Sequence, residues 1–201
     1  MIKWENLSKS YGRRRLFSEL SGAVGDGSSL LVTGFNGSGK STFLKILAGL
    51  VRADRGAVMR PRDRNAVGYA APHMALYGEL TGIENVQFAM GVRGLKSDSA
   101  VAVSVLARMG LELSANKLVS AYSTGMVQRA KIACAIAHEP ALLILDEPTI
   151  GLDRDGVNLV EELVAEHVAG RTGGGAIIAT NEPEHFARLI GSGWAGLDMG
   201  V

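Results

Sequence analysis

The stretch GFNGSGKST, residues 34–42, has the residue types and the spacing of a loop that binds phosphate. Its glycines let the backbone turn amide groups inward around phosphate oxygens, and a helix that begins near Lys40 would point its positive end at the same anion. Lys40 would reach the outer phosphates, and Ser41 would supply an oxygen ligand to Mg²⁺. A glycine-rich turn that merely contains Lys-Ser does not explain the strand-like run before it and the helical pattern after it. The sequence therefore predicts a nucleotide site at Gly34, Asn36, Gly37, Ser38, Gly39, Lys40, Ser41 and Thr42.

A pair of carboxylates follows the apolar run in LLILDEP, residues 142–148. A buried strand would deliver Asp146 to its polar end, where the carboxylate can hold Mg²⁺, usually through water. Glu147 comes next and can orient and deprotonate a water molecule for in-line attack on a phosphate. An apolar run before Asp-Glu is weak evidence alone, because carboxylates end many strands. Combined with the phosphate loop, it predicts hydrolysis of a nucleoside triphosphate.

A third apolar run, AIIAT at residues 176–180, leads into Asn181. Hydrolysis of a nucleotide phosphate would place a proton-handling side chain such as histidine at that strand end. Asparagine cannot take up a proton at neutral pH, although its amide can donate a hydrogen bond. The residues thus leave three hypotheses open: a working enzyme, a slow enzyme, or a switch that only binds nucleotide.

The elements that must position these residues are visible as apolar patterns. The five-residue runs at 141–145 and 176–180 are typical of strands buried on both faces of a parallel sheet, and a helical pattern over 156–168 separates them. A helix is also predicted from Lys40 to about Leu50, and residues 72–118 repeat apolar side chains at helical spacing without a strand candidate. Shorter strands are predicted in IKWENL, LFSEL, SLLVT, AVM and AVGYA. This order predicts an α/β fold with a helical insertion.

Size, charge and cysteine content exclude several classes of protein. With 201 residues, of which 47% are apolar, the chain can bury a substantial core. Its formal net charge of +1 does not favour nucleic-acid binding, and Arg13–Arg15 are interpreted as a solvated turn. Cys134 is the only cysteine, so no internal disulfide and no cysteine metal site is expected. The chain shows no signal-peptide pattern and no apolar run of the ~18 residues needed to span a bilayer.

The longest informative stretch is YSTGMVQRAKIACAIAHEPALLILDEPTIGLD, residues 122–153. It resembles the ABC (ATP-binding cassette) ATPases, whose signature, of the form LSGGQ, lies shortly before the strand that carries the catalytic carboxylates. Ser123 and Gly125 match that signature, whereas Thr124 and Met126 depart from it. Asp153 in GLD matches the D-loop of the family, and Tyr11 falls where the family has an aromatic residue that stacks on adenine. The resemblance covers nearly the whole chain.

The resemblance implies a fold and a domain organisation. The fold is a P-loop NTPase (RecA-like), with a mostly parallel sheet core, an N-terminal antiparallel β subdomain and an inserted α-helical subdomain. Residues 1–201 would form one ABC nucleotide-binding domain. Residues 1–71 and 136–201 would make the β subdomain and ATPase core, and residues 72–135 the helical signature subdomain.

The resemblance also implies partners and cofactors. Two cassettes would face head to tail around two Mg-ATP. They would be two copies of this chain, or this chain with a second cassette. The signature of one chain (Ser123, Thr124, Gly125, Met126) would then meet the γ-phosphate held by Lys40 of the other. A separate transmembrane permease would dock on the cassette, which would be cytoplasmic and peripheral at the inner face of the cell membrane. Met74, Leu76 and Tyr77 would be divided between the helical core and an exposed groove for that permease.

Two positions depart from the family pattern. The Q-loop position holds His73 instead of glutamine, and the charge of histidine changes near neutral pH. Asn181 stands where the family has a switch histidine that contacts γ-phosphate. Asn181 cannot become a cation and stabilises developing charge less well, and losing one such contact costs ~10²–10³ in rate. His185 is expected at the surface and not as a substitute, and His138 and His167 are interpreted as ordinary helix residues.

Among ABC proteins, the short chain and the stretches YSTGM and DRDGVNLVEELV most resemble the small cassettes of haem-exporter (cytochrome c maturation) and related ABC-2-type export systems. The expected function is therefore ATP hydrolysis that drives a permease, slow because of Asn181 or dependent on the assembled partner. The alternatives are a soluble ABC ATPase scaffold, as in iron–sulfur cluster assembly, and a nucleotide-gated switch with little hydrolysis.

Overall fold

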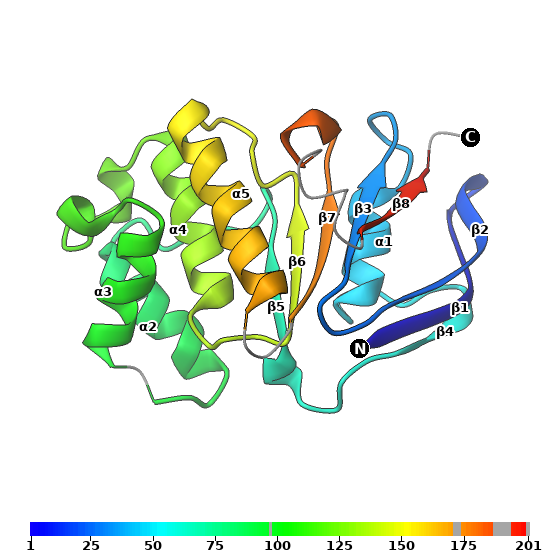
Figure 1. The fold of residues 1–201 in the computed structure, drawn as a ribbon, viewed down its shortest axis with the longest axis horizontal. Helices are drawn as coiled ribbons and strands as arrows, with labels where there is room; N and C mark the ends of the chain where they lie inside the picture. Colours follow the sequence, from blue (N-terminus) through cyan, green and yellow to red (C-terminus); the bar gives the residue numbers. More distant parts are fainter. Residues whose placement is uncertain (97, 171–173, 187–193, 200–201) are drawn as a thin grey trace.

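The computed structural model describes residues 1–96, 98–170, 174–186 and 194–199. This part of the chain contains eight strands in two sheets and five α-helices. Figure 1 shows the antiparallel sheet at one end of the molecule, the parallel sheet in the middle and most of the helices at the other end. Four short 3₁₀ segments complete the described elements: η1 (Arg64–Ala66), η2 (Glu112–Ser114), η3 (Val119–Ala121) and η4 (Pro183–Phe186).

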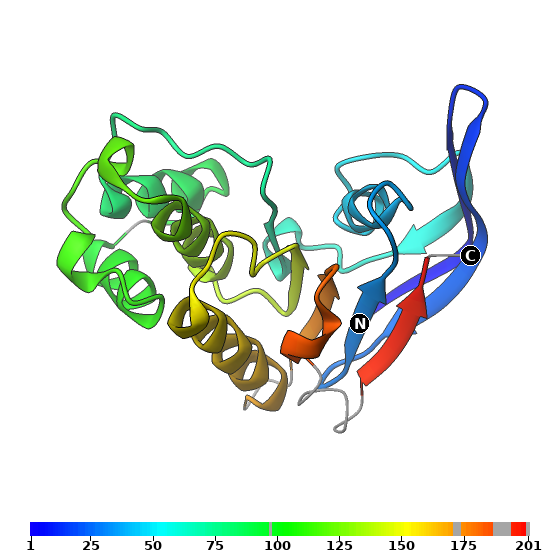
Figure 2. The same cartoon turned by 90° about the horizontal axis from the view of Figure 1, so that it is seen from above.

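The smaller sheet is antiparallel and has the strand order β2-β1-β4. Its strands are β1 (Ile2–Tyr11), β2 (Arg14–Val24) and β4 (Arg55–Met59). Ile2, Trp4 and Leu7 of β1 are buried, and the ring of Trp4 packs edge-on against Phe43, with the centroids 5.5 Å apart. This sheet therefore covers the helix that follows the phosphate loop (Figure 2).

The larger sheet is parallel throughout and has the strand order β5-β6-β7-β3-β8. Its strands are β3 (Ser29–Thr33), β5 (Val67–Ala70), β6 (Leu142–Asp146), β7 (Gly175–Ala179) and β8 (Trp194–Asp198). Every residue of β6 and β7 is buried, as the uninterrupted apolar runs predict for central parallel strands. Because all five strands run the same way, their carboxyl ends lie along one edge of the sheet.

Two apolar cores lie on the two faces of the parallel sheet. Successive side chains of a strand point to opposite faces, so Leu143 and Leu145 enter one core and Leu142 and Ile144 the other. The first core packs against α2 (Gly82–Val92), α3 (Ser99–Arg108), α4 (Thr124–Ile136) and α5 (Arg154–Ala169). The second packs against α1 (Lys40–Leu47) and the antiparallel sheet.

Several helices begin at residues that satisfy their first backbone amides. Thr81 and Glu84 form a capping box at α2. Ser123 and Asp153 cap α4 and α5, each accepting a hydrogen bond from a backbone N–H of the first turn. Two of the stretches singled out in the sequence, the signature and the D-loop, thus carry the residues that fix where these helices start.

The predicted fold class is confirmed: the core is a parallel sheet, with a separate antiparallel β subdomain and helices inserted between β5 and β6. The helix after the phosphate loop ends at Leu47, because Gly49 has a positive φ of 81°. Among the described helices, none combines the length and the apolarity that crossing a bilayer requires.

The sequence did not predict β8, which pairs with β3 at the edge of the parallel sheet. The strand reads WAGLD and has neither β-branched residues nor a regular apolar alternation. Its position follows from tertiary pairing with β3 and not from its own residue types.

Candidate functional site

The carboxyl ends of three neighbouring strands bring the predicted site residues together. The phosphate loop follows β3, Glu147 follows β6 and Asn181 comes two residues after β7. These strands are adjacent in the sheet order β6-β7-β3. The loops at this edge of an open parallel sheet are where ligands bind in α/β folds.

The phosphate loop has the backbone shape that its glycines permit. Gly37 and Gly39 have positive φ angles of 88° and 107°, a region that other residues rarely adopt. A Cβ on Gly39 would lie 3.2 Å from the Cβ of Leu16, so this glycine also allows close packing against β2. Gly39 precedes α1, and no described side chain caps that helix. The free amides of its first turn therefore remain available to an anion.

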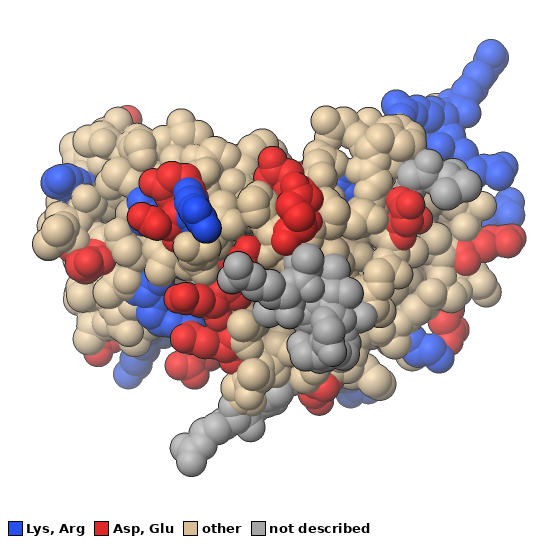
Figure 3. All heavy atoms as spheres, turned by 45° about the horizontal axis from the view of Figure 1, so that its top comes forward, with Lys and Arg blue, Asp and Glu red and all other residues tan. Residues whose placement is uncertain are grey.

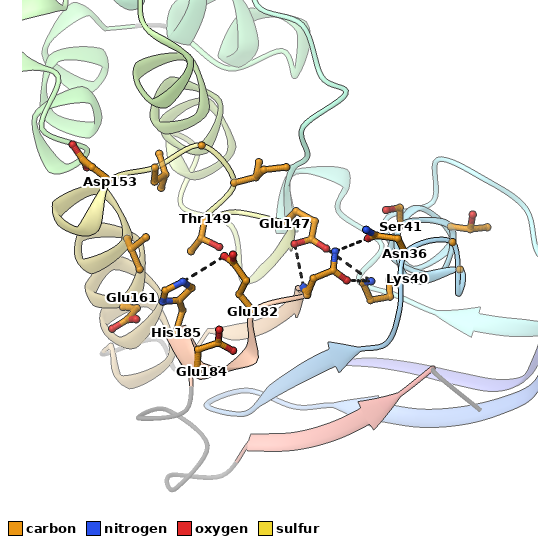
Figure 4. Close-up of a pocket in the computed structure, with 18 of the residues that line it drawn as sticks. Asn36, Lys40, Ser41, Glu147, Thr149, Asp153, Glu161, Glu182, Glu184 and His185 are labelled. Atoms are coloured by element: carbon orange, nitrogen blue, oxygen red, sulfur yellow. Dashed lines mark hydrogen bonds and ion pairs between the residues drawn. The ribbon is translucent and has the colours of Figure 1, made fainter.

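Lys40 is buried and lies at the centre of the site, with 5% of its surface exposed. Its ammonium group donates to the carbonyl of Gly34 at 2.7 Å and, more weakly, to that of Phe35 at 3.4 Å. It also donates to Oδ1 of Asn181 at 2.6 Å. Oε1 of Glu147 lies 3.9 Å from the same nitrogen. Lys40 is thus oriented by the loop on one side and by β6 and β7 on the other (Figure 4).

Asn181 joins the phosphate loop to the carboxylate of Glu147. Its Nδ2 donates to Oδ1 of Asn36 at 2.6 Å, while its Oδ1 accepts from Lys40. Its backbone N–H donates to Oε2 of Glu147 at 3.2 Å. The oxygen of a neutral amide accepts hydrogen bonds and its nitrogen donates them, so one side chain can bind a donor and an acceptor at once. Asn181 therefore contacts Lys40, the predicted phosphate-binding residue, and the predicted general base in the same conformation.

Asp146 and Ser41 form a pair of oxygen donors beside the loop. Asp146 is 2% exposed, and burial raises the pKa of its carboxyl, opposed by a hydrogen bond from Ser41. Among the described residues, Oδ1 of Asp146 has no hydrogen-bond partner. Buried carboxylate oxygens are normally paired or bound to metal. A hydroxyl and an unpaired carboxylate oxygen are ligands that suit Mg²⁺, so the residues fit that ion.

Glu147 occupies an unusual backbone conformation. Its φ is 45°, in the left-handed region, and its N–H donates to the carbonyl of Ala179 at 2.8 Å. Burial raises the pKa of its carboxyl, while the hydrogen bond from the Asn181 amide and the charge of Lys40 lower it. A carboxylate with a raised pKa is a stronger base, as a residue that takes a proton from water must be.

His73, at the predicted Q-loop position, lies close enough to Asp146 for their charges to interact. It is exposed, and its ring centroid is 6.3 Å from that of Tyr69. Desolvation lowers its pKa, reinforced by the charge of Lys45 and opposed by that of Asp146. These effects favour the neutral ring of His73, which can donate or accept a hydrogen bond.

An open cleft of about 1080 Å³ lies over the phosphate loop. Tyr11 and the loop line one wall, and residues of the D-loop, α5 and η4 line the other. Tyr11 is 55% exposed at the end of β1, where a ring could stack on a base. Asp153 lines the cleft, but its Oδ1 already accepts from the N–H of Gly156 at 2.8 Å.

His185 also lines the cleft, on the wall opposite Lys40 (Figure 4). Its Nε2 lies 3.4 Å from Oε2 of Glu182. The ring is half-buried, and it faces the acidic wall formed with Glu184 and Glu161. The structure therefore does not bring His185 to Lys40.

The predicted signature residues lie outside this cleft. Ser123 and Thr124 are at the start of α4, and Oγ of Ser123 accepts from the N–H of Met126 at 3.2 Å. A Cβ on Gly125 would lie 3.1 Å from the carbonyl of Gly151, so glycine here permits close contact with the D-loop. None of these four residues lines the cleft with Lys40.

Two residues near the site were not predicted to belong to it, and one of them, Arg14, had been interpreted as part of a solvated turn. Gln128 of α4 is buried, and its Nε2 donates to the carbonyls of Glu147 and Pro148, each at 3.3 Å. The sequence does contain a signal for Gln128: it is a polar residue four positions before Ile132, and therefore on the same buried side of a helix. Arg14 donates from Nη2 to the carbonyl of Gly37 at 2.8 Å, a contact that no local pattern indicates.

Comparison with known proteins identifies relatives of this site. A sequence model described as "ABC transporter" matches residues 17–150. The chain is 33% identical over 201 residues to the "Lantibiotic transport ATP-binding protein SrtF" of Streptococcus pyogenes, covering 95% of this chain and 86% of that protein. It is also 33% identical over 216 residues to the "Glutamate/aspartate import ATP-binding protein GltL" of Escherichia coli, covering 100% and 88%.

A solved structure has a similar overall fold. This structure is the "Dimeric structure of a post-hydrolysis state of the ATP-binding cassette MJ0796 bound to ADP and Pi". It superposes with a TM-score of 0.85 at 26% sequence identity, covering 100% of this chain and 95% of that one. The agreement therefore extends over both sheets and the helical insertion.

Proposed function

Because the chain belongs to the ABC transporter family, as the matched family and its relatives show, we propose that it is the subunit that binds and hydrolyses Mg-ATP to drive a separate permease. One observation carries the proposal. The phosphate-binding Lys40, the buried Asp146 with an unpaired oxygen and the base Glu147 converge at one edge of the parallel sheet. Each residue suits one part of phosphoryl transfer.

The chain's own groups divide the work of hydrolysis. The amides of the phosphate loop and the ammonium of Lys40 bind the β- and γ-phosphates, and Tyr11 offers a face for the base. Ser41 and Asp146 would hold Mg²⁺, which would offset the charge that develops on the phosphate oxygens. Glu147, with its raised pKa, orients the attacking water and takes up its proton.

We propose that turnover is slow because of Asn181. Its amide donates and accepts hydrogen bonds but carries no charge, so it stabilises the developing negative charge less than a cationic side chain does. In this structure both ends of that amide are already engaged, by Lys40 and by Asn36. Nucleotide phosphate must share or replace those contacts.

The second part of the proposal is a head-to-tail dimer around two ATP. The signature residues Ser123, Thr124, Gly125 and Met126 do not line the cleft of their own chain, so a second cassette must supply them to the phosphate. The start of α4 at Ser123 adds backbone amides that favour an anion. The related ATP-binding cassette MJ0796 is dimeric in its structure with ADP and Pi, which supports this arrangement.

The third part is a permease bound at an apolar groove between the segment after β5 and helix α2. The groove has a volume of about 380 Å³ and is lined mainly by apolar side chains, among them Met74, Leu76, Tyr77, Phe88 and Val92. Tyr77 and Phe88 pack edge-on with centroids 4.7 Å apart and are about half exposed. An exposed apolar groove of this kind favours a protein partner. The chain would then lie at the inner, cytoplasmic face of the membrane, and we infer no nucleic-acid partner.

The finer assignment is export. The stretches YSTGM and DRDGVNLVEELV resemble the small cassettes of haem-exporter and related ABC-2-type systems, and the name of the relative from Streptococcus pyogenes refers to lantibiotic transport. We propose export with a haem or cytochrome c maturation role as the candidate. The name of the Escherichia coli relative refers to import, so the direction needs a direct transport measurement.

The test is steady-state Mg-ATP turnover against protein concentration, for the wild type and for Glu147→Gln. A rate per chain that rises with concentration and disappears in Glu147→Gln is the expected result, since each site needs residues of two chains. ATP binding without turnover in both proteins would favour the nucleotide-gated switch.

For the permease, co-purification in mild detergent with a polytopic membrane protein is expected. Recovery with soluble partners alone would favour the soluble scaffold.

A further inference from the structure

Arg14 lies against the phosphate loop although it belongs to a run of arginines at a turn. It is the first residue of β2 and the Cα partner of Tyr11 across the antiparallel pair, so its place beside the cleft is fixed by backbone pairing. Its Nη2 donates to the carbonyl of Gly37 at 2.8 Å. A Cβ on Gly37 would lie 3.3 Å from the same nitrogen. The guanidinium is therefore in direct contact with the loop that cradles phosphate.

The cleft is lined by more negative than positive side chains, so a second cation beside Lys40 would help an anion to bind. Among the described residues that line it, five carboxylates face three permanent cations. The carboxylates are Glu147, Asp153, Glu161, Glu182 and Glu184, and the cations are Arg14, Lys40 and Arg154. Figure 3 shows Lys and Arg side chains gathered at the β1–β2 end of this face and Asp and Glu side chains around η4 and α5. A polyphosphate entering here meets an excess of negative charge.

Arg14 is the more accessible of the two cations beside the loop. Lys40 is buried and already donates to three oxygen atoms. Arg14 is exposed, and no carboxylate of the described residues forms a salt bridge with it. A guanidinium has five N–H donors, and the carbonyl of Gly37 takes one of them. Within the described part of the chain, no side-chain acceptor is bound to the remaining donors, so they can meet an anion at the mouth of the cleft.

We propose that Arg14 binds the phosphate chain of the nucleotide as a second cation beside Lys40, and that Arg13 and Arg15 do not. The planar guanidinium matches phosphate oxygens with paired N–H donors. Arg14 and Tyr11 thus form one end of the site, with the cation toward the phosphates and the ring toward the base. The proposal rests on the proposed function and adds a specific residue to it.

A merely structural role for Arg14 makes a different prediction. If the side chain only clamps the carbonyl of Gly37, then Arg14→Gln keeps an N–H donor and should preserve affinity. If its charge binds phosphate, Arg14→Lys should preserve most of the affinity and Arg14→Gln should not. Arg13→Gln and Arg15→Gln remove the same charge from neighbouring exposed positions that do not line the cleft. These two variants measure any general effect of net charge.

The experiment is calorimetric titration of the full chain with Mg-ATP, Mg-ADP, AMP and adenosine at two salt concentrations. We expect Arg14→Gln to weaken Mg-ATP binding about tenfold, the scale of one exposed charge-assisted hydrogen bond. We expect Arg14→Lys to stay within about threefold of the wild type, and the two control variants within about twofold. The loss should shrink from ATP to AMP, vanish for adenosine and diminish at high salt.

The outcomes separate this inference from the function on which it rests. Wild-type protein that does not bind Mg-ATP overturns the proposed function and this inference with it. Wild-type binding with equal losses in Arg14→Gln, Arg13→Gln and Arg15→Gln overturns only the role of Arg14. So does an Arg14→Lys variant as weak as Arg14→Gln, or a loss of equal size for adenosine. Circular dichroism of each variant, unchanged from the wild type, shows that the comparison is between folded proteins.

Discussion

At the scale of single residues, the site is organised around one neutral amide. Asn181 accepts from Lys40 at 2.6 Å and donates to Asn36 at 2.6 Å. The sequence indicated its position at the end of β7, together with the phosphate loop and the two carboxylates, because these depend on short local patterns. It did not indicate the hydrogen bond between Asn181 and Asn36 or the contact of Arg14 with Gly37. Both depend on which loops the fold places side by side.

The first prediction concerns this amide. Asn181→His should raise ATP turnover about tenfold or more, because a cationic donor at this place stabilises developing charge and its loss costs ~10²–10³. The measurement is steady-state phosphate release at chain concentrations that saturate assembly, with Asn181→Ala as a control that should be slower than the wild type. No gain in Asn181→His would mean that this residue does not limit the rate.

A second residue-scale prediction concerns His138, which the sequence suggested to be an ordinary helix-end residue. Burial lowers the pKa of its ring to about 4, reinforced by the charge of Arg93 and opposed by a contact to the carbonyl of Val67. Because the pKa of this histidine falls on folding, its contribution to stability is present above the unfolded pKa of ~6.5. That contribution is lost as the pH falls through the folded value.

Urea unfolding at pH 7 and pH 5 tests this expectation. The loss of stability between the two pH values should be smaller in His138→Gln than in the wild type, since glutamine does not take up a proton. His185→Gln, at a solvent-accessible contact with Glu182, is the matched control for the replacement of a histidine by glutamine. Equal pH dependence in wild type and His138→Gln would contradict the assignment.

At the scale of elements, helix α4 connects two parts of the site. Its first residue follows the cap at Ser123, and Gln128, one turn further on, holds the carbonyls of Glu147 and Pro148. One helix therefore presents the predicted signature at its start and supports the loop of the predicted base along its side. The sequence predicted the strands β6 and β7 from uninterrupted apolar runs. It missed β8, whose residues have no strong strand preference.

The prediction at this scale is that Gln128→Leu impairs both stability and catalysis. Leucine cannot donate to either carbonyl. The carbonyl of Glu147 keeps a hydrogen bond from the N–H of Ile150 at 3.3 Å. Loss of the donor to the carbonyl of Pro148 should cost ~1–3 kcal/mol of stability. Turnover should fall further than ATP affinity, because the base moves while the phosphate loop does not. Gln87→Leu on α2, whose amide donates to exposed Ser99 at 3.1 Å, is the matched control. A variant with normal turnover at full occupancy would show that Gln128 is only structural.

At the scale of the whole molecule, each chain of the proposed dimer would present half of two different sites. Its cleft carries the phosphate loop and Glu147, while the start of α4 carries the signature on a separate surface. The resemblance to the ABC family implied this division before the structure placed either part. In the proposed dimer a closed site needs two chains, and occupancy by ATP should determine whether they associate.

This division predicts that Glu147→Gln forms a stable dimer with Mg-ATP. Glutamine removes the base but keeps the side-chain shape, so ATP stays intact between the chains. Light scattering should show a monomer without nucleotide and a dimer at saturating Mg-ATP. The double variant Lys40→Ala, Glu147→Gln should remain a monomer, because the phosphates lose their buried cation. A Glu147→Gln monomer at saturating Mg-ATP would argue against the composite site.

The backbone of Glu147 is left-handed, with φ at 45°. This conformation lowers the stability of the fold at a position where the proposed hydrolysis needs a carboxylate. Such a conformation costs a residue with a Cβ ~1–2 kcal/mol relative to glycine. Glu147→Gly should therefore unfold at higher denaturant than Glu147→Ala, although both lack the base. The proposed role of Glu147 as the base favours glutamate at a position where the backbone favours glycine. A screen of variants for thermostability alone would discard the glutamate, and a lineage freed from hydrolysis would be expected to lose this residue early.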